Sequence, residues 1–207
     1  LPETAPGTAG RRRDAYARVL RLPRTVPLAL YVACSFGAYF ALISGSPFAL
    51  VAQMHVASAP YAAAFAINAC ALLAGSFTTG RLVARVGAER LFAGGVALGV
   101  VASAIACAVD VLAPTPAGFT ATFALFAFAF GIALPNAYAA ALADAGSDAG
   151  TTSAVLGATQ MIGGAIASAL STALPLLPSA GIGVTVLAAS VLAALVYIWS
   201  RSGLQRR

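Results

Sequence analysis

The sequence predicts an all-α integral membrane protein in which six transmembrane helices form one bundle. Of the 207 residues, 60% are hydrophobic and only 9% are charged, whereas ordinary globular domains carry roughly a quarter charged residues. The mean hydropathy is +0.91. All twelve basic residues are Arg, in three blocks separated by long apolar stretches. This pattern excludes a soluble domain and a disordered segment, and it argues against a basic face that binds nucleic acid.

Six apolar runs are long enough to cross a bilayer, which takes about 20 mostly apolar residues. The breaks between the runs are short and carry turn-forming residues. We therefore expect a cytoplasmic segment over residues 1–25, a six-helix bundle over 26–200 and a cytoplasmic tail over 201–207. The predicted spans are 26–52, 61–82, 91–112, 119–142, 151–174 and 182–200.

The positions of the Arg residues predict the orientation of the chain. Six Arg precede the first span, three lie between the second and third spans, and three follow the sixth, while the loops after spans one, three and five carry none. Because Arg and Lys concentrate in cytoplasmic loops, both termini are predicted to be cytoplasmic.

No charged residue lies in the middle of a span, and Asp110 and Asp144, at span ends, are expected to be solvated. Large uncharged polar groups concentrate in spans one, two, four and five. Such groups need partners or water in hydrocarbon, so they either bond helices together or line a central aqueous cavity. The candidate cavity residues are Tyr31, Tyr39, Ser46, Asn68, Asn136, Tyr138 and Gln160.

Two spans contain paired Gly and Pro residues, at Gly45 with Pro47 and at Gly131 with Pro135. Proline removes a hydrogen bond from a helix and permits a kink. These two spans are the first helices of two sets of three spans. The matching Gly/Pro interruptions therefore indicate a 3+3 inverted repeat, in which such interruptions often mark a transport site. All four residues are candidate gating positions.

The segment between spans two and three resembles the cytoplasmic signature loop of the major facilitator superfamily. In this loop Gly80 would permit close helix approach, Arg81 and Arg85 would anchor the cytoplasmic side, and Gly87 would allow the tight return before Arg90. Further segments, in order along the chain, resemble the Bcr/CflA family of multidrug efflux transporters within that superfamily. They are Leu1-Pro2-Glu3-Thr4, Gly45-Ser46-Pro47-Phe48, Phe65-Ala66-Ile67-Asn68-Ala69, Gly131 to Ala137, and Ala149-Gly150 with Ser153 to Gln160.

The resemblance implies that the chain is the C-terminal half, helices seven to twelve, of a drug:proton antiporter in the bacterial inner membrane. Its partners would be the lipid bilayer, an N-terminal six-helix half and small amphipathic drug-like substrates. The resemblance implies alternating access without a cofactor or metal, driven by a proton gradient, with the proton-carrying carboxylate in the N-terminal half. Helices seven, eight, ten and eleven would face the central cavity.

Three alternatives remain open on the sequence alone. One is a major facilitator transporter of another solute, such as a sugar, an amino acid or a metabolite. Another is a stand-alone half-transporter of six helices. An intramembrane enzyme is the least favoured, because no His or Asp lies in the middle of a span to activate a serine hydroxyl.

Overall fold

The computed structural model describes residues 9–173 and 178–202, and there it is helical throughout apart from short turns. Six of its helices are long and apolar enough to cross a membrane, which confirms the predicted fold class. The elements are α1 Ala9–Arg21, α2 Thr25–Ser46, the π-helix η1 Pro47–Gln53, α3 Ser58–Val86, α4 Ala88–Leu112, α5 Pro116–Ala143, the 3₁₀-helix η2 Gly146–Asp148, α6 Ala149–Ala173 and α7 Pro178–Ser202.

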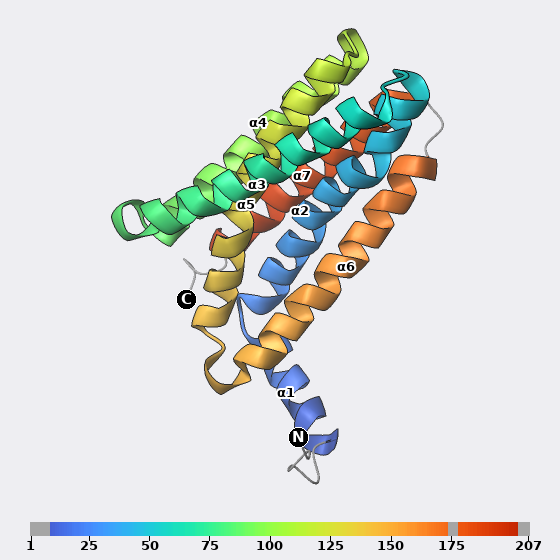
Figure 1. The fold of residues 1–207 in the computed structure, drawn as a ribbon. Helices are drawn as coiled ribbons and strands as arrows, with labels where there is room; N and C mark the ends of the chain where they lie inside the picture. Colours follow the sequence, from blue (N-terminus) through green and yellow to red (C-terminus); the bar gives the residue numbers. More distant parts are fainter. Residues whose placement is uncertain (1–8, 174–177, 203–207) are drawn as a thin grey trace, which may run out of the picture.

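The helices extend beyond the predicted spans, since polar and charged residues at a span end continue the helix into the headgroup region. The sequence did not predict α1, an Arg-rich helix of 13 residues that projects from the lower end of the bundle (Figure 1). The Leu1-Pro2-Glu3-Thr4 motif and residues 203–207 of the predicted tail lie outside the described residues.

The packing of the helices follows two related sets of three. The central helix α2 packs mainly against α6 and α7, and the central helix α5 packs mainly against α3 and α4. If α2, α3 and α4 are exchanged with α5, α6 and α7 in that order, the contacts of α2 with α6 and α7 become the contacts of α5 with α3 and α4. An inverted repeat requires this correspondence. Helices α3 and α6 lie on either side of α2 in Figure 1 and diverge toward the lower end of the bundle. They are the least buried spans. We call the side of the bundle between them the open face.

Glycines set the two closest helix crossings. A Cβ on Gly163 of α6 would meet the backbone carbonyl of Ala33 on α2. At the other crossing between the repeats, a Cβ on Gly131 of α5 would meet the carbonyl of Leu72 on α3. Without water to drive association, membrane helices gain stability from close packing, which small residues permit. These two crossings occupy related positions in the two sets of three helices.

The structure corrects the expectation for one acidic residue at a span end. Asp110 is not solvated: it is 4% exposed, at the far end of α4 where this helix packs against Gly183 of α7. The absence of a side chain at Gly183 makes room for the carboxylate. Asp144 is exposed as expected, at the end of α5.

Five of the described Arg residues lie at one end of the bundle, which we call the arginine end, and the other five lie on α1. The arginine end comprises the start of α2, the α3–α4 turn, the α5–α6 turn and the end of α7. Three ion pairs join separate elements there, and the sequence did not predict them. They are Arg18–Asp148 at 2.9 Å, Arg24–Asp144 at 3.6 Å and Arg201–Glu89 at 3.5 Å. Exposed pairs of this kind stabilise a protein only weakly, by about 0–1 kcal/mol each.

We predict that Gly163→Ala destabilises the chain by about 1–3 kcal/mol, the usual cost of overpacking, because its methyl group would meet the Ala33 carbonyl. Gly157→Ala is the matched control on the same helix, since a Cβ there meets nothing within 4 Å. Thermal unfolding in detergent measures both. Equal melting temperatures for the two variants would contradict the proposed role of the crossing.

Candidate functional site

A polar contact joins the first two helices of the N-terminal repeat. Asn68 Nδ2 on α3 donates a hydrogen bond of 3.3 Å to the Tyr39 hydroxyl on α2, and Asn68 is only 1% exposed. No described residue hydrogen-bonds to Asn68 Oδ1, which leaves a buried acceptor available for a donor group. Closer to the far end, the hydroxyl groups of Ser46 and Tyr61 lie 3.2 Å apart.

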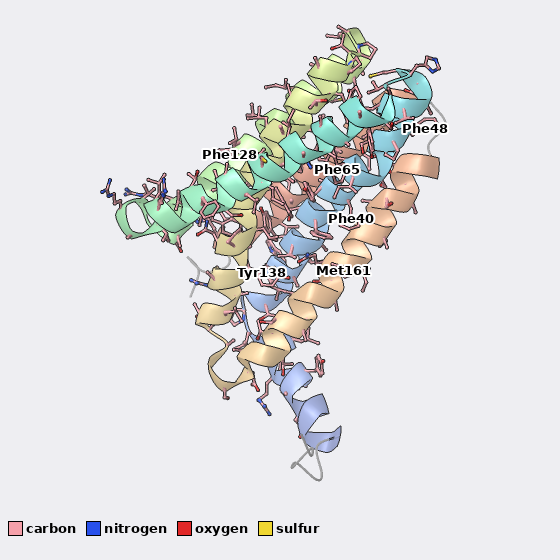
Figure 2. The ribbon with its side chains drawn as sticks, viewed as in Figure 1. Phe40, Phe48, Phe65, Phe128, Tyr138 and Met161 are labelled. Atoms are coloured by element: carbon pink, nitrogen blue, oxygen red, sulfur yellow. The ribbon has the colours of Figure 1, made fainter. Side chains whose placement is uncertain are left out.

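The C-terminal repeat has a corresponding contact between its first two helices. The Tyr138 hydroxyl on α5 donates a hydrogen bond of 2.7 Å to Gln160 Oε1 on α6, and both side chains are partly exposed. Figure 2 shows Tyr138 beside the space between α3 and α6, with Phe40 of α2 above it. In each repeat, a tyrosine on the first helix therefore bonds to an amide on the second.

Aromatic rings form the buried layer between α2 and α5. The Tyr39 ring stacks on Phe130 with centroids 4.8 Å apart and an angle of 9°. Phe36 stacks on Phe40 at 4.6 Å and approaches Phe130 at 6.0 Å. The polar contact of Tyr39 with Asn68 is therefore held at the edge of a rigid aromatic cluster, which we expect to fix its position.

A serine from a neighbouring helix compensates for Pro135. In an α-helix, proline leaves the carbonyl of residue i−4 without its amide donor, and here that carbonyl belongs to Gly131. The Ser76 hydroxyl on α3 donates to the Gly131 carbonyl oxygen at 3.3 Å. The helix α5 continues unbroken through Pro135 to Ala143, so Pro135 does not interrupt it.

A serine also compensates for Pro47, but the outcome differs. Pro47 deprives the Ile43 carbonyl of its amide donor, and the Ser46 hydroxyl donates to that carbonyl at 2.9 Å. From Pro47 the backbone changes to the wider π-helix, which ends at Gln53. The two prolines are thus chemically similar but change their helices differently. Gly45, the other candidate here, packs against Ile182 of α7.

The position of Asn136 differs from that of Asn68. Its Nδ2 donates to the Ile132 carbonyl at 2.7 Å and lies 3.5 Å from Thr79 Oγ1 of α3. Asn136 lines a cavity at the arginine end, between α2, α4, α5 and α7. Sequence reasoning missed Thr79, although it lies on the same side of α3 as Asn68, eleven residues or about three helical turns away.

Tyr31 is a correction to the predicted cavity residues. It is 3% exposed and packs edge-on against Phe92 of α4, with ring centroids 4.8 Å apart. A small void beside it is lined by α2, α4, α5 and α7, without α3 or α6. The structure therefore places Tyr31 in the core and away from the open face. The polar residues of α2 wind around the helix, so they do not all point to the same side.

The signature-like loop forms an abrupt turn between α3 and α4. Gly87 alone separates the two helices and has φ 88°, a conformation that favours glycine, so the predicted tight return is present. The predicted role of Gly80 is wrong, since a Cβ there would meet nothing within 4 Å. Arg81, Arg85 and Arg90 are all exposed at the arginine end.

The comparison with known families agrees with this geometry. The sequence profile of the Major Facilitator Superfamily matches residues 2–168, which include the first four spans, most of the fifth and the loop around Gly87. The chain belongs to the major facilitator superfamily. Members of this superfamily are transporters, so this chain is a membrane-embedded transporter domain. A search of curated proteins found no match to this major facilitator chain.

We predict that Ser76→Ala destabilises this major facilitator domain by about 0.6 kcal/mol, the average for a hydrogen bond between membrane helices. The effect should vanish in a Pro135→Ala background, because an alanine at that position restores an amide donor to the Gly131 carbonyl. Chemical unfolding in mixed micelles measures the double-mutant cycle. An unchanged effect of Ser76→Ala in that background would show that the serine does not compensate for the proline.

Proposed function

We propose that the chain is the C-terminal half of a Bcr/CflA-type multidrug efflux antiporter that exports small amphipathic molecules by alternating access. The main support is the pair of tyrosine–amide contacts, Tyr39–Asn68 and Tyr138–Gln160, one in each repeat, beside an aromatic cluster. Polyspecific sites are mostly apolar with a few orienting polar groups, and this arrangement supplies both.

The uncharged character of these groups favours neutral or weakly charged substrates. Asn68 and Gln160 can each form one hydrogen bond with a solute, and the partly exposed ring of Phe40 offers a flat apolar surface. A strongly charged sugar phosphate or carboxylate would need a cation near these groups, and the described Arg residues lie at the arginine end and on α1. Major facilitator transport of such solutes is therefore less well supported.

The open face supports a second six-helix bundle as the partner. Helices α3 and α6 expose large apolar side chains such as Phe77 at 68% and Met161 at 56%. We place the N-terminal half over this face, so that substrate binds between the halves. The halves would then rock between inward-open and outward-open states, and substrate would shift the population between them.

Proton coupling would depend on a carboxylate of the other half. Among the described residues of the six spans, each acidic side chain lies near a helix end: Glu89, Asp110, Asp144 and Asp148. Intramembrane carboxylates commonly carry protons in transporters, and the helix centres in this half offer none. With the arginine end in the cytoplasm of a bacterial inner membrane, both termini would be cytoplasmic.

We predict that Asn68→Ala and Gln160→Ala each reduce drug export by the transporter that contains this chain. The loss of one hydrogen bond worth about 1 kcal/mol lowers apparent affinity about fivefold. Drug accumulation in cells expressing the full transporter measures the effect, and surface abundance is measured in parallel. Thr159→Val is the matched control, because the Thr159 hydroxyl donates only to carbonyls of its own helix.

Unchanged export by both amide variants, at normal abundance, would contradict the proposed site. Export of sugars or amino acids by the wild-type transporter, without export of drugs, would contradict the proposed substrate class and favour another major facilitator activity. Export by this chain expressed alone would favour the stand-alone half-transporter.

A further inference from the structure

Two adjacent glycines of α6 meet α2 in different ways. A Cβ on Gly163 would meet the backbone of Ala33, and a helix backbone in a close-packed interior cannot move aside without cost. A Cβ on Gly164 would instead have ring carbons as its three nearest neighbours, two of Phe36 at 3.2 and 3.3 Å and one of Phe40 at 3.3 Å. Gly163 therefore fixes the helix crossing, whereas Gly164 makes room for two aromatic rings.

These two rings form one flat apolar surface. Phe36 and Phe40 stack with centroids 4.6 Å apart and an angle of 28°. Phe36 is buried and also approaches Phe130 at 6.0 Å. Phe40 is half-buried, and Figure 2 shows it on the side of α2 between α3 and α6, which is the open face. Phe40 is therefore the ring that a solute on the open face can contact.

A side chain at Gly164 would change this surface. Carbon atoms in contact normally lie about 3.5–4.0 Å apart, so a methyl group at Gly164 would displace one of the two rings. Phe36 is enclosed, so Phe40 is the ring that yields, and the open face is the space into which it can move. Substitution of Gly164 therefore narrows the space beside Phe40, while the helix crossing at Gly163 is unchanged.

A hydrogen-bond donor lies one helical turn from Gly164. Gln160 precedes it by four residues, so both lie on the same side of α6, about 6 Å apart along the helix axis. The Tyr138 hydroxyl donates to Gln160 Oε1 at 2.7 Å, which holds the amide in place. The amide nitrogen carries two N–H donors, and no acceptor among the described residues bonds to it. A donor is thus held beside the flat ring of Phe40.

We infer that Gly164 is a specificity-determining residue, because it keeps the space beside Phe40 open for a planar aromatic solute that carries a carbonyl group at its edge. The solute stacks on Phe40, and its carbonyl oxygen accepts a hydrogen bond from Gln160 Nε2. This inference rests on the proposed function, since it places the transported solute on the open face. It narrows the substrates from amphipathic molecules in general to flat ones with an acceptor.

Three neutral probes separate the two requirements. Fluorenone is planar and has a carbonyl, fluorene is planar without one, and benzophenone has the carbonyl but twisted rings. Binding of radiolabelled fluorenone to the purified full transporter in lipid nanodiscs, with the other two probes as competitors, measures the relative affinities. We expect fluorenone to bind about fivefold more tightly than fluorene, the effect of one hydrogen bond. It should also bind about fivefold more tightly than benzophenone, which cannot stack flat.

Three variants assign these preferences to residues. Gly164→Ala should abolish the preference for fluorenone over benzophenone, because the displaced Phe40 ring fills the flat space. Gln160→Met should abolish the preference over fluorene and keep the preference over benzophenone. Gly157→Ala is the matched control on the same helix, since a Cβ there meets nothing within 4 Å, and it should change neither ratio. Each readout is a ratio of affinities within one variant, so partial unfolding would lower all affinities together and leave the ratios unchanged.

Equal affinities for the three probes in the wild-type transporter would overturn the inference. A fluorenone preference that survives Gly164→Ala would do the same, and so would an equal loss of all three affinities, which would assign the glycine to folding alone. Phe40→Leu keeps Gly164 but removes the flat ring, and it should also abolish the preference over benzophenone. Thermal unfolding checks that each variant is folded.

Drug export by the full transporter distinguishes this inference from the proposed function. Export of drugs together with equal probe affinities would overturn the inference alone. A fluorenone preference without export of any drug would overturn the efflux function and leave the binding site of the planar solute in place.

Discussion

The close approach of backbones at glycine is the constraint on which the rest of the structure depends. Gly163 lets α6 lie against the backbone of α2 at Ala33, and Gly131 lets α5 lie against α3 at Leu72. These contacts fix the register of each second helix against the opposite central helix. The same two second helices, α3 and α6, then carry Asn68 and Gln160, which bond to Tyr39 and Tyr138 on the first helices of their own repeats.

Satisfaction of backbone polar groups is the second constraint, since hydrocarbon offers no water to bond them. Pro47 and Pro135 each leave one carbonyl without its amide donor, and in both cases a serine hydroxyl supplies the bond. Ser46 acts within its own helix, whereas Ser76 comes from α3. The second arrangement ties the α3–α5 contact to the presence of Pro135, so helix packing and backbone bonding depend on each other there.

The sequence predicted the number of spans, the tight turn at Gly87 and the segregation of Arg, because these depend on local hydropathy and backbone preference. It could not predict where Tyr31 and Asp110 lie. The polar and apolar residues of α2 wind around this helix, and other helices cover it on several sides. The packing of these neighbours therefore decides which residue of α2 faces α4 and which faces α3. Thr79 and the Arg201–Glu89 pair were missed for the same reason: their partners are distant in sequence.

The two repeats match at their glycine crossings but differ at their prolines, and this difference bears on how the domain moves. The helix α5 stays α-helical through Pro135, braced by Ser76, whereas α2 changes to a π-helix at Pro47. The π-helix leads into a turn at His55, whose φ of 53° is uncommon for a residue with a side chain. Wider π turns are weaker points in a helix and often occur at functional sites. Bending during alternating access is therefore expected at the far end of α2, while α5 moves as a rigid rod with α3 and α4.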